Sequence, residues 1–172
     1  MDTESTNQAV NGAHTTAGRP HGFSSLTPYI AVTGAGEALD FYRHTFSAEL
    51  VDCTEMPGPD ETPIVVHATL DFGAGRLQLG EVNPDFHLVA APPGDDDCYS
   101  IGLYVPDVDA VMERAVAAGA TIREDVTTFV SGDRYGSIRD PYGVRWSILT
   151  RVEDLSDEES AERVAAWAAS MA

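Results

Sequence analysis

The chain has 172 residues, 43% of them hydrophobic, and a formal net charge of −18. This length suits one domain or two small modules that share a core. Ten Lys and Arg residues stand against 28 Asp and Glu residues, so the positive charge that attracts phosphate backbones is missing and we expect no nucleic-acid partner.

The sequence also argues against a membrane protein. No run approaches the roughly 20 apolar residues that span a bilayer, and the first residues lack the basic and apolar regions of a secretory signal. Cys53 and Cys98 have no metal-ligand spacing, and two isolated cysteines are typical of reduced thiols. We therefore expect a cytoplasmic protein with no membrane partner.

The first part of the chain predicts one βαβββ unit after a polar start. Residues 1–23 have no hydrophobic periodicity and are expected to form a disordered tail. A helix is predicted over 36–46, where Ala38, Phe41 and Tyr42 recur at helical spacing. The strands are predicted at 26–32, 48–56, 62–73 and 75–82.

The same order of elements then repeats. A helix is predicted over 107–119, with Gly119 at its C-terminal end. The strands of this second unit are predicted at 99–105, 121–129, 134–139 and 144–152. Such a repeat predicts an α+β domain over 24–152, built from modules 24–81 and 97–152 and a linker 82–96. Because ligand sites favour module interfaces, we expect a pocket between the two halves.

Residues 153–172 predict a C-terminal amphipathic helix. Ser156 and Glu159 match a capping box. The apolar stripe consists of Val164, Trp167, Ala168 and Met171. Because the polar side is acidic, we expect this stripe to dock on the outer face of the sheet or on a dimer partner, not on a membrane.

The stretch GDRYGSIRDPYGVRWSIL, residues 132–149, predicts a β-hairpin. Asp140–Gly143 matches a type I turn with Gly143 at positive φ as a bulge. In this register Ile138, Trp146 and Ile148 share the core face. The other face receives Tyr135, Ser137, Arg139, Arg145, Ser147 and Leu149.

The hairpin register places Arg139 opposite Arg145. Two like charges directly opposite each other on neighbouring strands destabilise a sheet unless an anion lies nearby. The anion is either a carboxylate or phosphate of a ligand or a counter-ion such as Asp71. A solvated pair beside the turn is the third possibility.

The two modules, with ALDFYRHTF in the first helix and RDPYGVRWSI near the end, resemble the vicinal oxygen chelate superfamily of glyoxalase I, extradiol dioxygenases and fosfomycin and bleomycin resistance proteins. LTPYIAV and HATLDFG are similar to its PhnB-like branch. The resemblance implies a concave pocket enclosed by U-shaped sheets, and a homodimer. It also implies metal ligands, typically His and Glu, at the positions of Thr27, Gln78, Ser100 and Ser147.

None of those four residues is a His or a carboxylate, whereas metal sites in such enzymes use imidazole, carboxylate or thiolate ligands. A divalent metal remains possible, but we expect no cofactor and no metal ligand in this chain. Our leading interpretation is therefore a small-molecule-binding protein. Its expected ligand-binding residues are Tyr29, Thr69, Gln78, Tyr135, Ser137, Arg145 and Ser147.

His67 is the candidate catalytic residue, because imidazole exchanges protons near neutral pH. The alternative function is an isomerase, lyase or dioxygenase-type enzyme that uses His67 as acid or base, or a metal site built from other residues. A strand histidine bonded to a neighbour is the structural alternative. If the protein sequesters a drug or metabolite instead, the acidic charge favours a cationic ligand.

Overall fold

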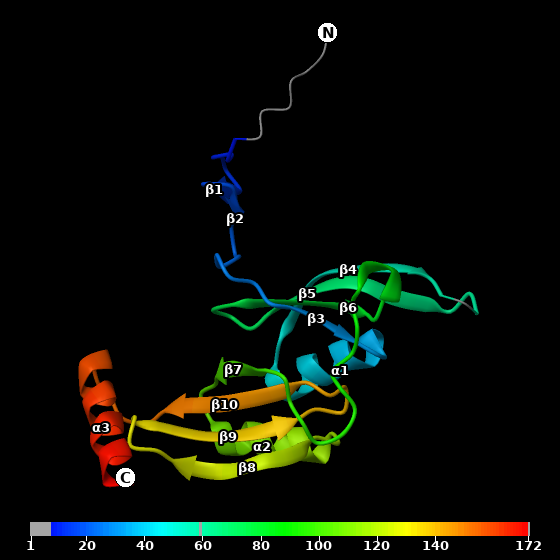
Figure 1. The fold of residues 1–172 in the computed structure, drawn as a ribbon. Helices are drawn as coiled ribbons and strands as arrows, with labels where there is room; N and C mark the ends of the chain where they lie inside the picture. Colours follow the sequence, from blue (N-terminus) through cyan, green and yellow to red (C-terminus); the bar gives the residue numbers. More distant parts are fainter. Residues whose placement is uncertain (1–7, 59, 172) are drawn as a thin grey trace.

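A computed structural model of the protein describes residues 8–58 and 60–171, and its elements follow the predicted order (Figure 1). The first module comprises β3 (Tyr29–Val32), α1 (Ala35–Phe46), β4 (Glu49–Pro57), β5 (Pro63–Asp71) and β6 (Arg76–Glu81). The second comprises β7 (Ser100–Tyr104), α2 (Val108–Ala117), β8 (Thr121–Thr128), β9 (Asp133–Arg139) and β10 (Arg145–Arg151). The helix α3 (Asp157–Ser170) follows. The predicted α+β fold with two βαβββ modules is confirmed.

Each module forms its own four-stranded mixed sheet. The strand orders are β3-β6-β5-β4 and β7-β10-β9-β8. In both sheets the first strand of the module pairs in parallel with the last strand, and the other neighbours are antiparallel. The parallel pair follows from the crossover helix, which returns the chain to the same end of the sheet.

The segment before β3 differs from the expected disordered tail. β1 (Thr15–Thr16) and β2 (Arg19–Pro20) pair as a small antiparallel hairpin. Its turn has Gly18 at φ 76°, and the Ala17 amide donates to Asn11 Oδ1 at 2.8 Å. The hairpin extends away from the two sheets (Figure 1). Residues 1–7 of the expected tail lie outside the described residues.

The register predicted for the β9–β10 hairpin is confirmed. Seven cross-strand pairs run from Arg145–Arg139 to Arg151–Asp133. Gly143 has a φ of 86°, which fits the predicted bulge, and the Asp140 amide donates to the Val144 carbonyl at 2.9 Å.

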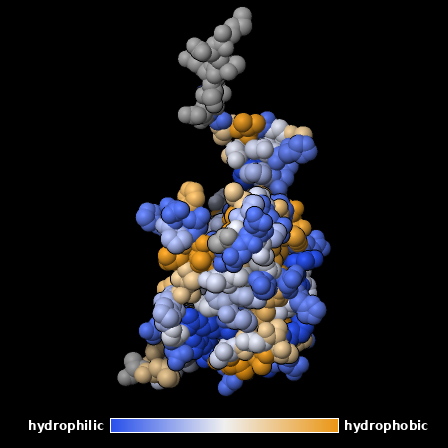
Figure 2. All heavy atoms as spheres, turned by 90° about the vertical axis from the view of Figure 1, so that its right-hand side faces the viewer, coloured by the Kyte–Doolittle hydropathy of each residue, from blue (hydrophilic) through white to orange (hydrophobic). Residues whose placement is uncertain are grey.

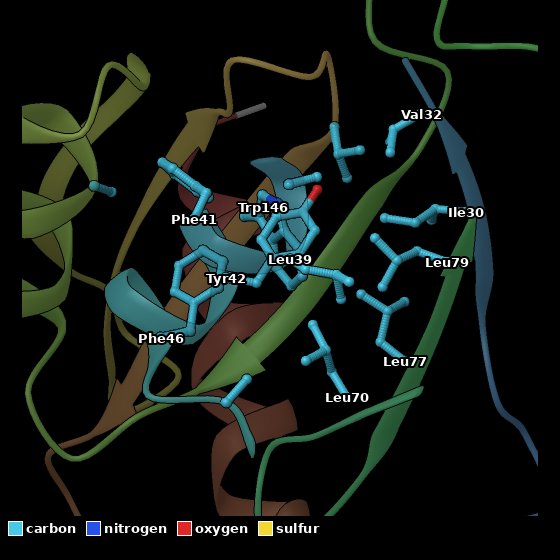
Figure 3. Packing of buried hydrophobic residues seen from close by; sticks show 14 of the residues in the cluster. Ile30, Val32, Leu39, Phe41, Tyr42, Phe46, Leu70, Leu77, Leu79 and Trp146 are labelled. Atoms are coloured by element: carbon cyan, nitrogen blue, oxygen red, sulfur yellow. The ribbon is translucent and has the colours of Figure 1, made fainter. Parts of the chain in front are cut away.

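The helix α1 packs against the apolar faces of both sheets. Phe46 lies 4.6 Å from Trp146 of β10 between ring centroids, and Tyr42 lies 5.2 Å from it. Figure 3 shows these side chains beside Trp146 and beside the aliphatic residues of β3, β5 and β6. Figure 1 shows α1 between the two sheets. One hydrophobic core therefore joins the two modules.

A buried carboxylate fixes this contact between the modules. Asp140, which is 4% exposed, accepts hydrogen bonds from Tyr42 Oη at 2.7 Å and from Trp146 Nε1 at 2.9 Å. The amides of Tyr142 and Val144 also donate to it, each at 2.9 Å. Burial raises the pKa of Asp140, although these hydrogen bonds act in the opposite direction.

The C-terminal helix α3 begins at the predicted capping box of Ser156 and Glu159. Its Trp167 makes an edge contact with Phe129 at 4.9 Å between ring centroids, but 42% of Trp167 stays exposed. The apolar stripe is thus covered only in part. Hydrophilic side chains cover most of the surface seen in Figure 2.

Among the helices of the described residues, none combines the length and the apolar composition that a membrane span needs.

The two neighbouring residues Trp146 and Ser147 provide a test of the hairpin register. Trp146 is 1% exposed, whereas Ser147 lies on the opposite face. Trp146→Ala should lower the free energy of unfolding by about 3–5 kcal/mol, and Ser147→Ala by less than about 1.5 kcal/mol, the worth of one hydrogen bond. Urea denaturation measures both, and equal losses would contradict the register.

Candidate functional site

The side of the first sheet that points away from α1 carries a group of polar side chains. Direct cross-strand pairing places Tyr29 beside Gln78, Gln78 beside Thr69, and Thr69 beside Asp52. His67 lies two residues before Thr69 on β5 and therefore shares its face. We call these five residues the first polar face.

The first polar face is closely packed around His67. The Tyr29 ring stacks on the His67 ring at 6.2 Å between centroids, and Asp52 Oδ1 lies 3.4 Å from His67 Nδ1. Tyr29 can cross β6 because residue 80 is glycine: a Cβ there would lie 2.5 Å from Tyr29 Oη. Burial raises the pKa of the Tyr29 phenol.

Thr69 lies fully buried within this face. Its Oγ1 has no hydrogen-bond partner among the residues that the structure describes. A buried hydroxyl without a partner is costly, and such groups in native proteins call for an explanation. The first polar face therefore contains an unused hydrogen-bonding group next to a histidine.

The second sheet carries a corresponding group on the side that points away from the helices. We call Tyr135, Ser137, Arg145, Ser147, Ser100 and Glu124 the second polar face. Glu124 Oε2 accepts from Ser137 Oγ at 2.6 Å and from Arg145 Nη2 at 2.7 Å. The hydroxyls of Ser100 and Ser147 are hydrogen-bonded at 2.8 Å.

The structure brings the predicted site residues together in two groups, not in one. Tyr29, His67, Thr69 and Gln78 lie on the first polar face, and Tyr135, Ser137, Arg145 and Ser147 on the second. Because α1 packs between the apolar sides of the two sheets, the polar faces point away from each other. Within the described residues, the two polar faces therefore do not line one common pocket. Residues of both modules do line cavities of about 630 and 350 Å³, but Tyr29 is the one predicted site residue among their lining residues.

The like-charge pair of Arg139 and Arg145 has a counter-ion, but it is not Asp71. Asp97, in the loop before β7, lies 3.6 Å from Arg139 and 3.5 Å from Arg145. Asp71 pairs with Arg76 at 3.0 Å instead. The sequence could not show this, because the path of the linker is set by tertiary contacts.

The family metal positions do not fit a divalent metal. Thr27 Oγ1 donates to the Ser24 carbonyl at 3.4 Å, and Ser100 and Ser147 bond to each other. With Gln78, the set offers three neutral hydroxyls and one amide, whereas such metals select imidazole, carboxylate or thiolate. Within residues 8–58 and 60–171, no group of three His, Cys, Asp or Glu is placed to hold an ion.

Sequence reasoning missed Asp52, Glu124 and Asp97. Asp52 and Glu124 come from β4 and β8, each of which lies at one edge of its sheet and has a register shifted by irregularities. Such shifts decide which side chains reach a given face and leave no reliable pattern. Gly80 was the available signal, since a glycine within a strand often marks a close approach.

Comparison with known proteins identifies the family. Residues 14–148 match the model of the Glyoxalase/Bleomycin resistance protein/Dioxygenase superfamily. The chain is 33% identical over 139 residues to the uncharacterised protein Rv0887c of Mycobacterium tuberculosis, covering 78% of this chain and 79% of that protein. The chain is also 33% identical over 139 residues to the uncharacterised protein Mb0911c of Mycobacterium bovis. The chain belongs to this superfamily.

Solved structures support the same fold. TioX from Micromonospora sp. ML1 is 26% identical with a TM-score of 0.56, covering 74% of this chain and 98% of that one. The PhnB protein from Bacillus cereus has a TM-score of 0.57 at 22% identity, covering 74% and 99%. The fosfomycin resistance protein FosX from Listeria monocytogenes, solved with Mn(II) and sulfate, has a TM-score of 0.58 at 12% identity, covering 82% and 97%. The last two show the fold alone.

The carboxyl of Glu124 provides a test of the second polar face. The hydrogen bond from Ser137 lowers the pKa of Glu124, with Arg145 adding to the effect against desolvation. Because the folded-state pKa lies below the unfolded one, ionised Glu124 stabilises the fold above the unfolded pKa, and this is lost as pH falls through the folded pKa. Ser137→Ala should raise the Glu124 pKa measured by NMR titration, and Ser147→Ala should leave it unchanged. The same pKa in both variants would refute the contact.

Proposed function

We propose that this protein binds a small molecule in a pocket formed between two copies of the chain. In this arrangement the first polar face of one copy meets the second polar face of the other. The protein is then a homodimer with two equivalent pockets, as closed twofold symmetry requires. Family membership supports the module architecture, and the polar faces supply the groups that would line the pocket.

The buried hydroxyl of Thr69 is the observation that carries this proposal. It has no hydrogen-bond partner among the described residues, although it lies beside Gln78, Asp52 and His67. Ligand pockets combine a few placed polar groups with apolar walls. Because Thr69 is fully buried, a ligand group would supply the missing partner by displacing the side chains that cover this hydroxyl.

The side chains on the two polar faces favour ligand binding without the family metal. The Ser100 and Ser147 hydroxyls bond to each other at 2.8 Å and add two polar groups to the second polar face. Arg145 adds a fixed charge to that face, held by Glu124 and Ser137. Hydroxyls, an amide and a guanidinium recognise the hydrogen-bonding groups of a ligand without a metal.

The unpaired, exposed Cys53 and Cys98 support a reducing, cytoplasmic setting.

Two buried threonines test the role of the Thr69 hydroxyl. Thr69 and Thr45 are both buried with an unpartnered Oγ1, but Thr45 lies on α1, away from the polar faces. Thr69→Val and Thr45→Val should each change the free energy of unfolding by less than about 1 kcal/mol, because no hydrogen bond is lost. In calorimetric titration with a small molecule found by thermal-shift screening, Thr69→Val should weaken binding about tenfold, as for one hydrogen bond.

Thr45→Val is the matched control and should bind that small molecule as the wild type does. Equal affinity of the wild type and both variants would remove Thr69 from the pocket. Equal weakening in both variants would show a general effect on the fold and would also count against the proposal.

An enzyme of the isomerase, lyase or dioxygenase type is the second candidate, favoured by the contact between His67 and Asp52. The carboxylate lies 3.4 Å from Nδ1 of the imidazole. A carboxylate in this position can orient the imidazole ring for general acid–base catalysis. His67 would then exchange a proton with the substrate through Nε2.

The enzyme proposal is tested with a substrate that the wild type turns over. His67→Ala should lower kcat/KM at least about 100-fold, the low end for acid–base catalysis. His44→Ala is the control, because His44 is exposed on α1, and it should leave kcat/KM unchanged. Turnover by His67→Ala at the wild-type rate would exclude His67 as the catalytic group.

A further inference from the structure

Three arginines converge on a single carboxylate where the linker reaches β7. The Asp97 oxygens lie 3.4 Å from Arg123 Nε, 3.5 Å from Arg145 Nη1 and 3.6 Å from Arg139 Nε. The Asp97 side chain is 7% exposed. These are three of the ten Lys and Arg residues in a chain of net charge −18. Positive charge is thus concentrated at one edge of the second polar face.

Asp97 fits this group of arginines poorly. Charge-assisted hydrogen bonds from a guanidinium to a carboxylate measure about 2.7–2.9 Å, and all three distances to Asp97 are longer. Asp97 Oδ1 and Arg123 Nε are both buried, and neither has a hydrogen-bond partner among the described residues. Arg123 Nε is therefore a buried donor that Asp97 does not satisfy.

We propose that Arg123, Arg139 and Arg145 recognise an oxyanion group of the ligand, a carboxylate or a phosphate, and that Asp97 takes its place in the free protein. This inference rests on the proposed function, because Arg145 belongs to the second polar face beside Ser137. Guanidinium groups match the geometry of both oxyanions. An entering oxyanion replaces the Asp97 carboxylate without leaving the arginines unpaired.

The linker, which leads directly into Asp97, is attached by the same arginines. Arg139 donates to the carbonyls of Pro92 and Gly94, and Arg123 donates to the carbonyl of Asp95 at 3.1 Å. The linker therefore covers the arginine group and holds Asp97 in place. Displacement of Asp97 by a ligand would loosen this segment and couple ligand binding to the position of the linker.

The nearby acidic groups do not cancel this preference for an oxyanion. Glu124 accepts from Arg145 at 2.7 Å and is partly neutralised by it. Asp95 is fully exposed, and its contact with Arg123 is 3.5 Å, so solvent screens it. The overall acidic charge favours a cationic ligand, whereas the local charge of these arginines favours an anionic one.

Asp97→Asn tests the inference directly. Thermal unfolding of the full chain is followed at pH 7 in sodium phosphate, in sodium acetate and in sodium chloride at matched ionic strength. Phosphate or acetate should raise the midpoint of D97N saturably, with an apparent affinity at least tenfold above that of the wild type, because the Asp97 carboxylate no longer competes. The more effective anion identifies the ligand group as phosphate or carboxylate.

Asp96→Asn is the matched control, since it makes the same charge change at the neighbouring position. It should respond to the anions as the wild type does, and adding Arg145→Gln to D97N should abolish the response. If D97N does not fold in chloride, phosphate or acetate should restore folding. Equal responses of D97N and D96N, or no effect of either anion, would overturn the inference. The Thr69→Val comparison uses another sheet and decides the proposed pocket separately.

Discussion

The fold depends on the burial of α1 between two sheets, and Asp140 is the residue that fixes this contact. Its carboxylate accepts hydrogen bonds from Tyr42 of the first module and from Trp146 and two amides of the second. A buried carboxylate is stable only when its hydrogen-bonding capacity is satisfied. Because donors from both modules satisfy it, Asp140 sets how one module sits on the other.

This arrangement determines where the predicted site residues lie. With their apolar sides on the helices, both sheets present their polar sides outward. The predicted site residues are therefore divided between two surfaces that one chain cannot bring together. We propose that a second copy completes each half, with Thr69 and His67 on one side of the pocket and the arginines around Asp97 on the other.

The sequence was sufficient for the architecture and for most of the polar faces. The repeat predicted both modules. The turn at Asp140–Gly143 fixed the register, which places Ser137 and Ser147 on one face of the hairpin and Trp146 on the other face. It was not sufficient for the relation between the modules, because strand alternation says which face is polar but not which way that face points. The partners Asp52 and Asp97 were also missed, since strand irregularities and the path of the linker bring them into place.

The pairing of polar faces between two copies is tested most directly by mixing two variants, each of which is damaged in one polar face. His67→Ala damages the first polar face, and Arg145→Ala damages the second. With a small molecule that the wild type binds, each variant alone should bind weakly. After dissociation and random reassociation, about a quarter of the pockets should regain wild-type affinity, because each mixed dimer contains one intact pocket. No recovery in demonstrated mixed dimers would contradict a pocket shared between copies.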